Sequence, residues 1–124
     1  QQLVEVGKAT SSFGMNRFVK DASALVLITL EPTNITSKLG CGIKDKDFPI
    51  MDLGIASAYM TLAAEDEGIG SCILGWFDEK KIKELVGVPQ KKRLMLIISL
   101  GYNLKPKRKK IRKDFDKVVS FEKY

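Results

Sequence analysis

The segment of residues 48–67, "FPIMDLGIASAYMTLAAEDE", has the pattern of a long helix whose apolar residues do not keep to one face. Asp47 is a candidate N-cap, Pro49 falls in the first turn, and Gly68 suits the position after the last turn. A helix that is apolar on more than one face has to be covered on more than one side. The chain is therefore predicted to fold around a central helix packed on several sides. Its apolar residues are Ile50, Met51, Leu53, Ile55, Tyr59, Met60 and Leu62, and small residues (Gly54, Ala56, Ser57, Ala58) leave room for close approach.

Two near-continuous apolar runs, residues 22–30 and 93–102, predict strands that are buried on both faces. Residues 2–10 and 79–86 have helical patterns, and residues 31–47 read as a loop. In the second helix Asp78 is the expected N-cap and Gly87 and Pro89 end it, with Ile82, Leu85 and Val86 facing inward. Because these elements lack a regular strand–helix–strand rhythm, they indicate an α+β fold. We expect one domain, with a core of residues 1–104 and a basic C-terminal arm of residues 105–124.

The chain contains no histidine and two cysteines, and this narrows the chemistry that it can perform. Without histidine there is no Ser-His or Cys-His nucleophile pair and no usual general base near neutral pH. Cys41 and Cys72 are far apart in sequence and form no CxxC, so we expect reduced thiols, a cytoplasmic protein and no metal site. Cys72 is predicted to be a packed structural residue. If the protein is an enzyme, a bound cofactor is expected to carry its chemistry.

The net charge of +6 is concentrated at one end of the chain. Residues 105–113, "KPKRKKIRK", hold seven basic residues and no acid, which leaves the rest of the chain nearly neutral. Such a run could bind nucleic acid, and this remains the weaker alternative. No aromatic residues are interleaved with these charges as a stacking platform for single strands requires.

The stretch of residues 68–77, "GIGSCILGWF", combines glycines with apolar residues. It fits neither common phosphate motif, because Ile73 replaces the third glycine of GxGxxG, and Trp76 and Phe77 replace the Lys and Ser/Thr of a P-loop. One interpretation is that Gly75 lets the backbone approach a flat partner and donate a hydrogen bond from its N–H. The other is a plain connection in which the glycines only make turns.

The segment "DLGIASAYMTLAAEDEGIGSCILGWFDEKKIKELVGVPQ" followed by "LMLIISLGY" resembles the nitroreductase family of FMN-dependent oxidoreductases. The resemblance implies a central, mostly antiparallel sheet flanked by helices and hydride transfer from NAD(P)H, through flavin N5, to a nitroaromatic, quinone or similar acceptor. Ile73, Leu74, Gly75 and Trp76 would line the flavin ring, with the Gly75 N–H near N5 and no catalytic side chain. Lys110, Arg112 and Lys113 would hold the FMN phosphate.

The resemblance also implies a homodimer with the flavin at its interface and the arm from Pro106 to Tyr124 around the partner. We expect no nucleic-acid partner and, because no apolar run approaches the length of a membrane span, no membrane partner. The family's N-terminal Arg-Ser-x-Arg element has no counterpart here, so the match begins partway through the family pattern. The alternative function is accordingly a non-catalytic or truncated relative.

Overall fold

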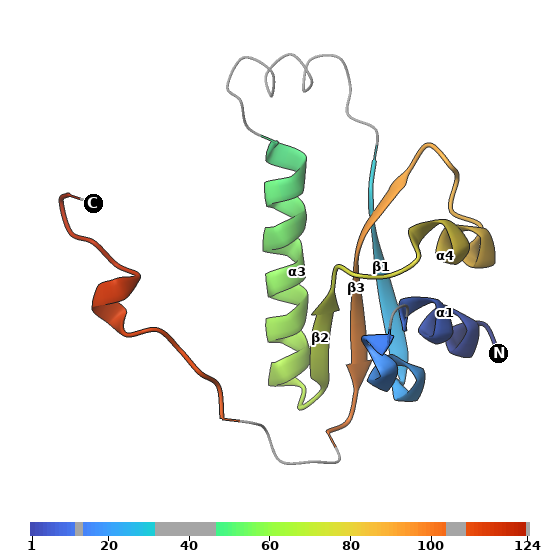
Figure 1. Ribbon diagram of the computed structural model, residues 1–124, viewed down its shortest axis with the longest axis horizontal. Coiled ribbons are helices and arrows are strands. Elements are labelled where there is room, and N and C mark those ends of the chain that lie inside the picture. The colour runs from blue at the N-terminus through green and yellow to red at the C-terminus, as the bar shows by residue number, and fades with distance from the viewer. Residues whose placement is uncertain (12–13, 32–46, 104–108, 124) are drawn as a thin grey trace.

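A computed structural model describes residues 1–11, 14–31, 47–103 and 109–123 as a three-stranded antiparallel sheet between two helical layers (Figure 1). The strands β1 (Ala24–Leu30), β2 (Gly70–Leu74) and β3 (Arg93–Gly101) lie in the order β1-β3-β2. Helix α3 (Phe48–Asp66) covers one face, while α1 (Gln2–Thr10), the 3-10 helix η2 (Arg17–Asp21) and α4 (Glu79–Val86) cover the other. A further 3-10 turn, η3 (Phe115–Lys117), lies in the arm. This arrangement confirms the predicted α+β fold.

The main hydrophobic core lies between the sheet and the layer of α1, η2 and α4. Ile97 from the central strand, Ile82 from α4 and Val19 from η2 are all fully buried there. Leu74 and Leu94 add side chains from the sheet, and Val6 and Ala9 add side chains from α1. The predicted inward face of α4 is confirmed, since Leu85 and Val86 pack against the same cluster.

The helix boundaries follow the predicted capping residues. The Asp47 carboxylate accepts a hydrogen bond from the Ile50 N–H at 3.3 Å, and Asp78 accepts one from the Lys81 N–H at 3.0 Å. Gly68 and Gly87 adopt left-handed φ values of 71° and 73° after α3 and α4, which a glycine does at low cost. No helix within the described ranges is long and apolar enough to cross a membrane.

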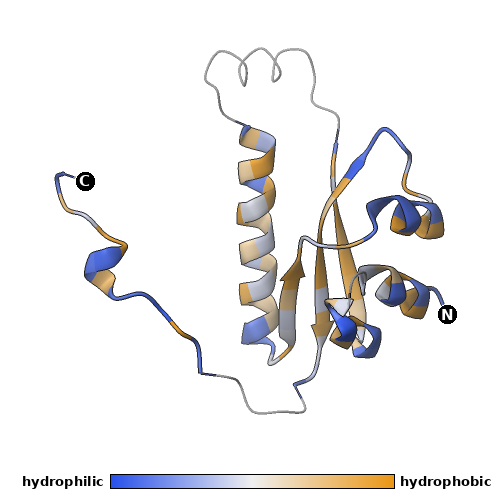
Figure 2. Cartoon of the chain, viewed as in Figure 1, coloured by the Kyte–Doolittle hydropathy of each residue, from blue (hydrophilic) through white to orange (hydrophobic). Residues whose placement is uncertain are grey.

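Two predictions of burial were wrong for the single chain. Helix α3 buries only Leu53, Ser57 and Ala64, because the sheet covers one side of it and nothing in the described chain covers the other. Figure 2 shows apolar residues along most of the length of this helix. An exposed apolar stripe runs along the side of α3 away from the sheet, and we call it the outer face of α3. Its residues are Met51, Ile55, Tyr59 and Leu62.

Strand β1 is half-buried along most of its length and is not buried on both faces, because it forms an edge of the described sheet. Strand β3 is the central strand, and there the predicted burial is confirmed. The predicted loop falls largely on residues 32–46, which lie outside the described part of the chain.

Glu79 joins the first turn of α4 to the start of β3. The Arg93 Nε–H is shared between the two carboxylate oxygens of Glu79, at 2.9 and 3.1 Å, and the Leu94 N–H donates to one of them at 2.9 Å. The Arg93 guanidinium and the Leu94 N–H hold the pKa of Glu79 below its ordinary value of 4.5. The ionised form is therefore the one that stabilises the fold.

Glu79→Gln is expected to lower the free energy of unfolding by about 1 kcal/mol at pH 7, since the glutamine amide has no charge to pair with Arg93 and one acceptor oxygen fewer. A carboxyl group whose folded-state pKa is lowered stabilises the fold above its unfolded-state pKa. That stability is lost as the pH falls through the lowered value. Denaturant titrations between pH 7 and pH 3 should therefore show the two proteins converging toward acid. A difference that persists unchanged at pH 3 would contradict this account.

Candidate functional site

The three glycines of the stretch 68–77 serve different purposes in the structure. Gly68 supplies the left-handed turn after α3. A Cβ placed on Gly70 would lie 2.7 Å from the side-chain amide of Asn103, an exposed side chain that would have to move aside. Gly75 has no positive φ, and a Cβ there would meet only the Leu96 Cδ2 at an ordinary 3.8 Å. Neither a turn nor packing inside the described chain explains Gly75, so the turn-only interpretation does not account for it.

The backbone pattern of the sheet directs the Gly75 N–H outward. The Leu100 carbonyl accepts a hydrogen bond from the Ser23 N–H at 2.8 Å and so points toward the β1 side of the sheet. Along a central strand, the N–H and C=O of successive residues point alternately to one neighbouring strand and to the other. Ile97 lies three residues before Leu100, so its N–H and C=O point toward β2. Ile97 pairs with Leu74. The same alternation along β2 points the N–H of the next residue, Gly75, away from β3 and toward the open edge of the sheet.

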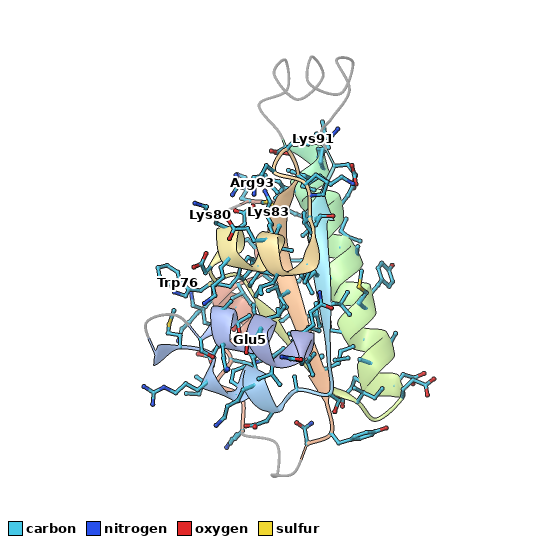
Figure 3. All side chains as sticks on the ribbon, turned by 90° about the vertical axis from the view of Figure 1, so that its right-hand side faces the viewer. Glu5, Trp76, Lys80, Lys83, Lys91 and Arg93 are labelled. Atoms are coloured by element: carbon cyan, nitrogen blue, oxygen red, sulfur yellow. The ribbon has the colours of Figure 1, made fainter. Side chains whose placement is uncertain are left out.

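The side chains around this N–H are apolar and partly accessible. Ile73 is 44% exposed and Trp76 is 54% exposed on either side of Gly75. Trp76 projects at the edge of the molecule beside α1 and α4 (Figure 3). Leu74, by contrast, is 4% exposed and packs into the core, so only its backbone can line the site. An outward N–H beside exposed apolar side chains and a bare backbone fits a flat aromatic ligand with a hydrogen-bond acceptor on its edge.

The C-terminal end of α1 holds the backbone that follows Gly75. The Asn16 side-chain amide donates hydrogen bonds to the Trp76 carbonyl at 2.9 Å and to the Thr10 carbonyl at 3.4 Å. The Asp78 N–H donates to the Ala9 carbonyl at 3.1 Å. These contacts also satisfy two of the last carbonyls of α1, which have no partner within the helix. Asn16 was not predicted from the sequence, where its one signal is an asparagine that closely follows the glycine in "FGMNRF".

The three basic residues predicted to hold a phosphate do not meet the glycine stretch within one chain. Lys110, Arg112 and Lys113 are exposed and lie in the arm, which Figure 1 places beyond α3 and away from β2. The arm is rich in exposed apolar residues as well, including Phe115, Val118 and Phe121. A site that needs both the glycine stretch and the basic residues has to draw on two chains or on another arrangement of the arm.

The prediction that Cys72 is packed was wrong, because the thiol is exposed on an edge strand. Its Sγ has one hydrogen-bond contact, at 3.9 Å to the Ile73 carbonyl. Cys41 falls outside the described residues, so the prediction of its free thiol stays untested. Within the described ranges, no group of three or more acidic, cysteine or histidine side chains lies together as a metal site.

The nitroreductase family model matches residues 1–102. A protein of Archaeoglobus fulgidus, provisionally described as an NADH dehydrogenase/NAD(P)H nitroreductase, is 30% identical to this chain over 99 residues. That alignment covers 77% of the chain and 53% of the relative, so the chain matches about half the length of the relative.

Two solved structures share the fold over nearly the whole chain. An FMN-dependent nitroreductase from Clostridium difficile R20291 is 27% identical and aligns with a TM-score of 0.71 over 99% of this chain and 70% of that one. A nitroreductase family protein from Streptococcus pneumoniae TIGR4 is 18% identical, with a TM-score of 0.75 over 98% of this chain and 75% of that one. At 18% identity, the similarity to the Streptococcus pneumoniae protein shows a shared fold alone.

Proposed function

Because the chain belongs to the nitroreductase family, we propose that it is the FMN-dependent part of an NAD(P)H oxidoreductase. When bound, the flavin would accept hydride from the nicotinamide at N5 and pass it to a nitroaromatic, quinone or similar acceptor. The chain contributes binding and orientation to this chemistry and supplies no catalytic side chain. The sequence contains no histidine, which agrees with chemistry carried by the cofactor and binding supplied by the chain.

The observation that best supports the proposal is the lack of a side chain at Gly75. Neither its φ nor the atoms around it require a glycine, since a Cβ there would make only an ordinary 3.8 Å contact with the Leu96 Cδ2. A flat ring bound against this backbone would explain the glycine, because only glycine lets the ring come within hydrogen-bond distance of the N–H. The exposed Ile73 and Trp76 side chains supply apolar contacts for such a ring.

We place the phosphate of the flavin near Lys110, Arg112 and Lys113 of a second copy of the chain. The guanidinium of Arg112 can bind two phosphate oxygens at once. The outer face of α3 supports a homodimer, because a stripe of four exposed apolar residues on one helix is costly to leave in water. In such a dimer the arm of each copy reaches the partner's glycine stretch.

Gly75→Ala tests the flavin site with little effect on the fold. The added methyl group meets only Leu96, so the free energy of unfolding of the flavin-free protein should change by less than about 0.5 kcal/mol. The same methyl group would separate the ring from the N–H, and the loss of that hydrogen bond and its contacts should weaken FMN binding at least about tenfold. Fluorescence titration with FMN measures the affinity.

Cys72→Ser is the matched control, because it changes an exposed side chain on the same strand three residues away. This control is expected to keep its FMN affinity. Equal affinity of Gly75→Ala and the parent protein would remove Gly75 from the site. A parent protein that takes up no added FMN would favour a non-catalytic relative.

A further inference from the structure

We propose that Asn16 is the positioning residue that aims the Gly75 N–H, an inference that rests on the flavin site proposed above. Asn16 lies 60 residues away in sequence and reaches the glycine stretch through the carbonyl of Trp76. Its side-chain amide bonds the carbonyls of Trp76 and Thr10 and acts on Gly75 only through the backbone. Its role is to fix the backbone that presents the N–H.

Gly75 is a single flexible residue between two fixed points. On one side, Leu74 is buried and paired with Ile97 in the sheet. On the other, the Trp76 carbonyl is held by Asn16 at 2.9 Å. Glycine has the widest choice of φ and ψ of all residues. Gly75 by itself therefore does little to fix the direction of its N–H. Fixing both neighbours restricts the direction of the N–H.

Asparagine suits this position for two reasons. The backbone of Asn16 is left-handed, with a φ of 55°, a conformation that glycine, asparagine and aspartate adopt most readily. Of these three, only asparagine carries a side-chain N–H donor. Both of its partners, the carbonyls of Trp76 and Thr10, are acceptors and therefore require that donor. The Asn16 amide thus ties the end of α1 to the residue after Gly75.

Two substitutions remove the donor while keeping a residue that tolerates the backbone conformation. Asn16→Gly deletes the amide, and Asn16→Asp replaces it with an acceptor facing the Trp76 carbonyl. Ser11→Ala is the matched control, because the Ser11 hydroxyl bonds the Gly7 and Asn16 carbonyls in the same turn and does not contact Trp76. Any effect of merely loosening this turn should appear in the control as well.

The first readout is the backbone ¹⁵N order parameter of Gly75 in the flavin-free protein. It should fall from about 0.85 in the parent protein and in Ser11→Ala to below about 0.6 in both Asn16 variants. The second readout is the reduction potential of bound FMN, which should shift in the Asn16 variants and not in Ser11→Ala. An unchanged Gly75 order parameter in folded Asn16 variants, or the same fall in Ser11→Ala, would overturn the proposal.

If neither Asn16 variant folds, the parent protein still decides the question. A scalar coupling across the hydrogen bond between Asn16 Nδ2 and the Trp76 carbonyl carbon is expected, and its absence together with a mobile Gly75 would refute the inference. The two proposals fail separately. A parent protein without FMN binding contradicts the flavin function, whereas the order parameter of Gly75 still reports whether Asn16 fixes this backbone.

Discussion

Ile97→Ala is expected to lower the free energy of unfolding by about 3 kcal/mol, within the usual range of about 2–5 kcal/mol for a buried isoleucine. Ile97 is fully buried on the central strand, where it pairs with Leu27 on one side and Leu74 on the other. Removing its side chain loses apolar burial and leaves a cavity that two paired strands cannot easily close. Because Leu74 precedes Gly75, the change should also loosen the glycine stretch.

Equilibrium unfolding in urea, followed by circular dichroism, measures this effect. Ile111→Ala is the matched control, since Ile111 is 97% exposed in the arm and its loss should change the free energy of unfolding by less than about 0.5 kcal/mol. Equal effects of the two substitutions would show that the core does not lie between β3 and the layer of α1, η2 and α4.

Ile55→Asp is expected to weaken self-association at least about a hundredfold. Ile55 is 56% exposed on the outer face of α3, so the single chain should tolerate the aspartate. In the proposed dimer the same position is covered by a partner, and a carboxylate without a partner charge is costly to bury. Sedimentation velocity over a range of protein concentrations measures the dissociation constant.

Val4→Asp likewise replaces an exposed apolar residue with aspartate, but on α1, which covers the opposite face of the sheet, and it is expected to leave the dimer intact. FMN binding should fall with Ile55→Asp, because the basic residues of the partner's arm would be withdrawn from the site. A parent protein that stays monomeric at high concentration would contradict the proposed interface. Equal weakening by both variants would contradict its location on α3.

Local signals in the sequence predicted the elements well. Asp47 and Asp78 cap helices as expected, and Gly68 and Gly87 end them, because these residues act on the backbone within one turn. The run of residues 93–102 predicted a buried strand, and β3 occupies the centre of the sheet. A similar run at residues 22–30 gave the same prediction and became an edge strand, since apolar content alone does not fix strand order.

Features that depend on distant contacts could not be predicted from local patterns. The apolar pattern of α3 predicted cover on more than one side, but a sequence does not say whether such cover comes from the same chain. Asn16 reaches Trp76 across 60 residues, and no periodicity marks such a contact. The sequence singled out Gly75, but only the space around its missing Cβ showed that packing in the described chain does not call for a glycine there.

The central claim is that the backbone at Gly75 carries a flavin, and the visible absorption spectrum of the purified protein tests it most directly. We predict a yellow protein that releases FMN on denaturation at about one molecule per chain, or that takes up added FMN to that ratio. A colourless protein that takes up no FMN, with its fold confirmed by circular dichroism, would contradict the claim.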